Sequence, residues 1–167
     1  MSSFELTGEL LLQGDRIAIM YEIPTAADLA RHLSTIMHEA HQKARAESAR
    51  LKSEFAAHSA ARSSRLIVAV AGRVNTIHKE ALAEATPVVL DIAKRMQIDI
   101  KQITLLARPY HENLADILLA EIPAAGHEAE QLRFRTQYAQ VFELRLDRAL
   151  RDVEIGFIGG RSDIADS

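Results

Sequence analysis

The stretch that decides the fold is TAADLARHLSTIMHEAHQKARAESARLKSEF, residues 25–55. At 100° per residue, the apolar side chains of one side fall within about 100° of one another and form one narrow stripe. Thr25 and Asp28 have the spacing of a capping box, so a helix should begin just after Pro24. The stripe consists of Leu29, Leu33, Ile36, Ala40, Ala44, Leu51 and Phe55.

This first helix is predicted to be long, because neither Gly nor Pro follows Pro24 until Gly72. A helix from Ala26 to about Arg62 would measure about 55 Å. A helix of this length is too long to be covered by a compact domain of this size. The apolar stripe therefore predicts a coiled-coil partner helix, from the same chain or another. The polar sequence at 62–65, RSSR, favours a break here, with Ser64 as the cap of a new helix.

Helical periodicity continues to about Ile155. We expect a kink or a restart at Thr86-Pro87, and a short helix capped by Asp99 that is interrupted at 108–109. A segment over 110–122 and a last helix over about 127–155 follow, with Arg145 on a charged, exposed flank. The stripes are Leu66, Val70, Val74, Ile77, Ala81, Ala85, Val88, Ile92 and Met96, then Leu114, Ile117, Leu118 and Ile122, then Tyr138, Phe142, Leu146, Leu150, Val153 and Phe157.

The N-terminal 24 residues differ from the rest, because apolar side chains alternate at period two from Ile17 to Ile23. With the apolar run over 4–12 and the turn at Gly14, this pattern predicts a β-hairpin. A lone hairpin is marginal in water, so it should lie on helices or pair with another chain. The expected fold is therefore mainly α: an elongated helical bundle with coiled-coil-like helices (25–157), a short N-terminal β-hairpin (1–24) and a flexible C-terminal tail (158–167).

The composition limits the chemistry. The chain has 167 residues, of which 48% are hydrophobic and 26% charged, and it contains no cysteine. Disulfides, thiol catalysis and Cys-ligated metals are excluded, and a cytoplasmic location is expected. No signal peptide and no membrane span is predicted, since no apolar run is long enough.

The histidines offer a candidate metal site. His38 and His41 are three residues apart, which makes them neighbours on a helix surface. They lie opposite the apolar stripe, so we expect both to face solvent. Apart from His127, the other histidines have no potential ligand at a suitable spacing, and we expect them at the surface or at helix caps. No cofactor is predicted. These are His32, His58, His78 and His111.

The densest polar and aromatic cluster, RPYHEN, spans residues 108–113. A small-molecule or catalytic site would be sought first at Tyr110, His111, Glu112 and Asp116. The alternative is an ordinary helix start at which the helix dipole favours acidic residues. No catalytic residue is assigned, because the sequence has neither a nucleophile elbow nor a phosphate-binding glycine loop.

The charge layout carries more information than any motif. Residues 31–79 hold nine Lys or Arg against three Glu, whereas both flanks are acidic and the whole chain carries −3. A basic helix can bind phosphates, an acidic helix or an anionic membrane surface. The candidate nucleic-acid-binding residues are Arg31, Arg45, Arg50, Lys52, Arg62 and Arg65.

The leading functional hypothesis is a non-catalytic structural or interaction protein, an adaptor or assembly component that works through long amphipathic helices. Its expected partners are a second copy, with a symmetric dimer favoured, and another protein. The alternative is a nucleic-acid-binding accessory or regulatory protein that uses the basic segment 31–79. An enzyme or metal protein is the third hypothesis.

Overall fold

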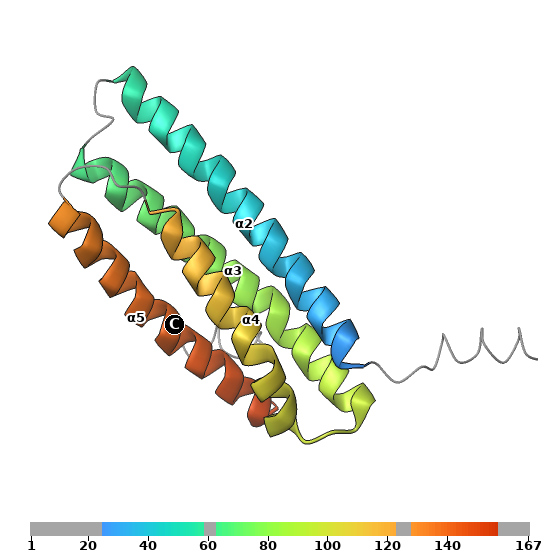
Figure 1. Cartoon of the computed structure of the whole chain (residues 1–167). Helices are drawn as coiled ribbons and strands as arrows, with labels where there is room; N and C mark the ends of the chain where they lie inside the picture. Colours follow the sequence, from blue (N-terminus) through green and yellow to red (C-terminus); the bar gives the residue numbers. More distant parts are fainter. Residues whose placement is uncertain (1–24, 59–62, 123–127, 157–167) are drawn as a thin grey trace, which may run out of the picture.

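The computed structural model describes residues 25–58, 63–122 and 128–156, which form four helices in an elongated bundle (Figure 1). They are α2 (Ala26–Ala57), α3 (Ser64–Met96), α4 (Ile100–Ala120) and α5 (Glu128–Glu154). The predicted mainly helical fold is confirmed. The predicted hairpin over 1–24, Arg62, Phe157 and the tail over 158–167 lie outside the described residues.

The helices are arranged around a central pair. Figure 1 shows α3 and α4 between α2 on one side and α5 on the other. Each outer helix contacts both central ones, and α2 and α5 do not touch over the described ranges. Since α3 runs antiparallel to α2 and α4, the outer helices each have one parallel and one antiparallel neighbour.

The predicted start and stripe of α2 are confirmed. The Thr25 amide donates to Asp28 Oδ2 at 2.7 Å, and the Asp28 amide donates to Thr25 Oγ1 at 3.4 Å, which closes the capping box. The stripe is buried from Leu29 to Leu51, and Phe55 is half-buried. It packs on α3 and α4, so the partner that this long helix needs comes from its own chain.

The predicted break between the first two helices is also present. α2 ends at Ala57, short of the expected Arg62, and α3 begins at Ser64. The cap is Ser63, whose side chain accepts from the Leu66 amide at 3.4 Å, and not Ser64 as expected. The cap is the residue before the first helical one and has an extended backbone, and Ser63 has this conformation, whereas Ser64 is already helical.

The restart expected at Pro87 and the interruption expected at Pro109 need correction. α3 continues through Pro87 without a restart, and α4 runs through Pro109 without the expected interruption. Each proline removes one hydrogen bond within its helix. Both side chains are exposed, so the carbonyl that loses its donor lies on the solvent side, where water replaces the bond.

Because α3 lies in the centre of the bundle, more of its side chains are buried than its apolar stripe predicts. Beyond the expected residues, a second side of the helix is buried against α4 and α5. The predicted stripe of α5 is confirmed, with Phe142 through Val153 buried and Tyr138 half-buried, and Gly156 (φ 75°) follows its end. The additional buried side chains of α3 are Ile67, Ala71, His78, Leu82, Thr86, Val89, Leu90 and Ala93.

None of the helices in the described ranges is both long enough and apolar enough to cross a membrane.

Candidate functional site

The two candidate metal ligands on α2 do not lie in the same surroundings. His38 is exposed, as expected. His41 is half-buried instead, because its Nε2 lies 3.4 Å from Glu121 Oε1 at the end of α4. Over the described ranges, no group of three or more His, Asp or Glu side chains is placed to hold a metal ion.

The cluster around Tyr110 is divided between two sides of α4. His111 is 6% exposed and points into the core, and Tyr110 is half-buried against it. Glu112 and Asp116 are exposed on the other side, where Glu112 pairs with Arg108 at 3.7 Å. The structure therefore does not bring the four together in one pocket, and the expectation of a surface position for His111 is wrong.

The charge of the basic segment is partly balanced within the chain. Arg31 pairs with Asp28 at 2.8 Å, Arg50 pairs with two glutamates at 3.0 Å each, and Lys43 pairs with Glu80 at 3.6 Å. The two glutamates that pair with Arg50 belong to the basic segment itself, whereas Glu80 comes from the acidic flank that follows it and joins α3 to α2. The cations of this segment that are exposed and make no ion pair in the described part are Arg45, Lys52, Arg65 and Lys79.

The sequence analysis missed a polar cluster between α3 and α5, formed by Asn75, His78, Phe142 and Arg145. His78 is fully buried and stacks on Phe142, with ring centroids 3.9 Å apart and planes 8° apart. Arg145 Nη1 donates to His78 Nδ1 at 2.9 Å, and its Nη2 donates to Asn75 Oδ1 at 2.7 Å. Arg145 therefore points inward, which corrects the expectation of an exposed flank.

The hydrogen bond from Arg145 decides the protonation of His78. A guanidinium only donates, so Nδ1 must accept and the neutral ring carries its proton on Nε2. That Nε2 is buried and has no hydrogen-bond partner among the described residues. Burial, the Arg145 charge and His111 lower the pKa of His78 to about 3, and burial with Arg108 lowers the pKa of His111 to about 4.

This cluster links two helices and leaves no room for a reaction on His78. A ring that is fully buried does not meet a substrate, but its contacts fix how α5 lies along α3, as buried polar pairs do in other bundles. Its signal in the sequence was the position of His78, four residues after Val74 and four before Leu82, on the side of α3 that faces a neighbour.

The surface candidate is the outward side of α5. Four uncharged residues recur at every fourth position, Leu132, Thr136, Gln140 and Leu144, and we name them the α5 ridge. All four are exposed, the two leucines by 65% and 70%.

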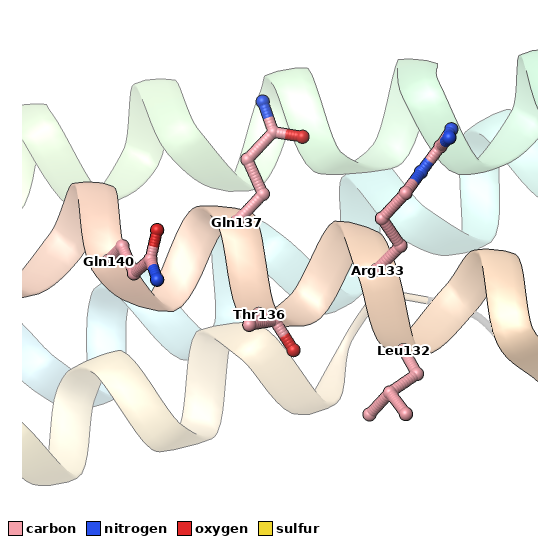
Figure 2. A pocket seen from close by; sticks show the side chains of 5 residues that line it. All are labelled: Leu132, Arg133, Thr136, Gln137 and Gln140. Atoms are coloured by element: carbon pink, nitrogen blue, oxygen red, sulfur yellow. The ribbon is translucent and has the colours of Figure 1, made fainter.

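A hollow in the surface lies along the first three ridge residues and is also lined by Arg133 and Gln137. Figure 2 shows all five side chains on α5, with Leu132 and Thr136 pointing to one side and Arg133 and Gln137 to the other. Such a ridge beside a hollow is a surface that can pack against a helix.

Searches against models of protein families, curated protein sequences and solved structures found no match to this chain.

Proposed function

We propose that the chain is a non-catalytic interaction protein that forms a symmetric dimer through the α5 ridge, and that the dimer serves as an adaptor or assembly component. The observation that carries this proposal is the exposed, uncharged ridge with a leucine at each end. The long stripe of α2 no longer argues for self-association, because α3 and α4 cover it.

The ridge suits contact with a copy of itself. With the two-fold axis perpendicular to α5, the two α5 helices meet in antiparallel order, so Leu132 of one copy lies against Leu144 of the other. Thr136 then faces Gln140, and the four residues span about 18 Å of helix. Ridges formed by every fourth residue pack into the grooves beside them, which is the commonest helix contact in globular proteins.

The proposed dimer is tested with Leu144→Glu. This change places a charge at both ends of the ridge pair, so we expect the dimer to weaken by at least about 100-fold, since a buried unpaired charge costs several kcal/mol. Sedimentation velocity over a concentration series measures the dissociation constant.

The matched control is Leu105→Glu, because Leu105 has nearly the same exposure, 69%, and lies on α4. We expect this variant to dimerise like the unmodified chain. A chain that remains monomeric at about 100 µM, or a Leu144→Glu variant that dimerises unchanged, would contradict the proposal.

A second candidate function, nucleic-acid binding, is favoured by one feature of α2. Arg31, His38, Arg45 and Lys52 recur every seven residues on its exposed side, about 10 Å apart along the helix. Arg31 is paired with Asp28, so Arg45 and Lys52 are the cations that remain for phosphates.

The variant carrying Arg45→Glu and Lys52→Glu tests this candidate. If these two side chains contact phosphates, the slope of log affinity against log salt should fall by about 2. Fluorescence anisotropy with a labelled duplex and a labelled single strand measures it. Replacing Gln42 and Ser53 with Ala is the control, and binding that does not weaken with salt eliminates this function.

A further inference from the structure

At one end of the bundle three large apolar side chains are exposed, Leu105 and Leu106 on α4 and Ile155 just after α5, and we name this surface the end patch. Their exposed fractions are 69%, 43% and 60%. Thr104 Oγ1 donates to Glu154 Oε1 at 3.3 Å, so the start of α4 and the end of α5 lie side by side. Leu105 and Ile155, each the next residue along its helix, are therefore at the same level of the bundle.

The chain enters the bundle at this same end. α2 and α4 run in parallel, because Asn113 contacts Met37 at 3.5 Å and Glu121 contacts His41 at 3.4 Å. Counting back along both helices from Met37 and Asn113 brings Thr25 to the level of the first turn of α4. Figure 1 likewise shows the start of α2, the start of α4 and the end of α5 at one end of the bundle.

The 24 residues that precede Thr25 have the composition of a segment that needs cover. They include nine large aliphatic or aromatic side chains, in addition to Met1 and Met20, and carry a net charge of −3. A stretch of 24 residues extends at most about 80 Å, and about half of that if it doubles back, so the end patch is within reach. The nine are Phe4, Leu6, Leu10, Leu11, Leu12, Ile17, Ile19, Tyr21 and Ile23.

The charges beside the end patch complement this segment. Lys101 lies four residues before Leu105, and Arg151 lies four residues before Ile155, so each is on the same side of its helix as the apolar residue. Both cations are exposed, and neither makes an ion pair within the described ranges. An acidic, apolar segment therefore meets an apolar surface with a cation on each helix.

We propose that residues 1–24 dock on the end patch of their own chain. Attachment at Thr25 gives the segment an effective concentration in the millimolar range near the patch, whereas a second copy is present at micromolar concentration. The docked segment covers Leu105 and Ile155 and leaves the α5 ridge free. This inference does not depend on the proposed dimer, because the two use different side chains.

The absence of cysteine makes thiol protection a clean test in the full-length chain. Leu105→Cys and Val68→Cys are prepared separately, and their rates of reaction with a maleimide are compared. Val68, 51% exposed on α3, is less exposed than Leu105 in the bundle. Docking predicts that the thiol at position 105 reacts at least about ten-fold more slowly than the thiol at position 68. Equal or faster reaction at position 105 would overturn the proposal.

Two further measurements identify what covers the patch. Ile17→Asp and Ile19→Asp are added together to each cysteine variant. They should abolish the protection at position 105 and leave the rate at position 68 unchanged; protection that persists overturns the proposal. Dilution from about 10 µM to about 0.1 µM should not change the protection, because the contact is within one chain. Protection that disappears on dilution would mean that a second copy of the chain covers the end patch, and this result would also overturn the proposal. Circular dichroism verifies that each variant retains its helices.

Discussion

Lowering the pH from 6.5 to 5 is expected to lower the free energy of unfolding by about 3 kcal/mol, because two histidines are held neutral in the core. Burial lowers the pKa of His78 to about 3 and that of His111 to about 4, while the unfolded chain binds protons from about pH 6.5 downward. The unfolded state therefore takes up more protons than the folded state in this range. Each histidine then lowers the free energy of unfolding by about 0.7 kcal/mol per pH unit at pH 6.5, rising toward about 1.4 kcal/mol per pH unit at pH 5.

The sign follows from the direction of the shifts. A group whose pKa is lower in the folded state than in the unfolded state makes its full contribution to stability at a pH above its unfolded pKa. This contribution decreases as the pH falls toward the folded-state pKa. The groups that face the two rings are Arg145 for His78 and Arg108 for His111, and both are cations that oppose protonation. Most carboxylates titrate below pH 5, so this window reports mainly on histidines.

Urea unfolding at pH 6.5, 6.0, 5.5 and 5.0 measures the effect. The variant His111→Met removes one buried imidazole at similar volume and should lower the slope by about half. His38→Ala, at an exposed position on α2, should leave the slope unchanged. A free energy of unfolding that is constant between pH 6.5 and 5 would show that the two rings are not held neutral.

Phe142→Ala is expected to destabilise the bundle by about 3–5 kcal/mol, the usual cost of a cavity left by a buried phenylalanine. The ring is 1% exposed, stacks on His78 and lies 5.8 Å from the Arg145 guanidinium. Its loss removes packing between α3 and α5 and also the surface on which His78 rests. A loss of this size is a large share of the total free energy of unfolding of a domain of this length.

The matched control is Leu144→Ala, two residues further along α5. Leu144 is 70% exposed, so its truncation in the monomer should change the free energy of unfolding by at most about 0.5 kcal/mol. Phe142→Leu should lie between the two. Urea unfolding at low protein concentration compares the three, and a loss below about 1 kcal/mol for Phe142→Ala would show that this ring is not packed as described.

Several elements could be predicted from the sequence because their causes are local. The capping box at Thr25 and Asp28, the break near Ser63 and the stripe of α5 depend on residues a few positions apart. The restart expected at Pro87 and the interruption expected at Pro109 were wrong for the opposite reason. Whether Pro87 or Pro109 interrupts a helix depends on whether the freed carbonyl faces water or the core, and this is known only when the neighbouring helices are in place.

The candidate site was less predictable than the helices. His78 and Arg145 are 67 residues apart in the chain and make a hydrogen bond only because α3 and α5 lie in parallel contact. A histidine in an apolar stripe and an arginine on a charged flank each have an ordinary local explanation. The same holds for the basic segment, because Glu80 reaches Lys43 only when α2 and α3 pack together.

The spacing of apolar residues and the capping residues by themselves determined that the part of this chain described is helical, that α2 begins just after Pro24 and that a break follows α2, since those features arise from backbone geometry within a few residues. Only the tertiary structure decided that the stripe of α2 is covered by its own chain, that α3 is buried on two sides, and that His78, His111 and Arg145 point inward. The physical reason is that burial and hydrogen bonding of a side chain are set by the helix packed against it, and its identity is not encoded in the local pattern.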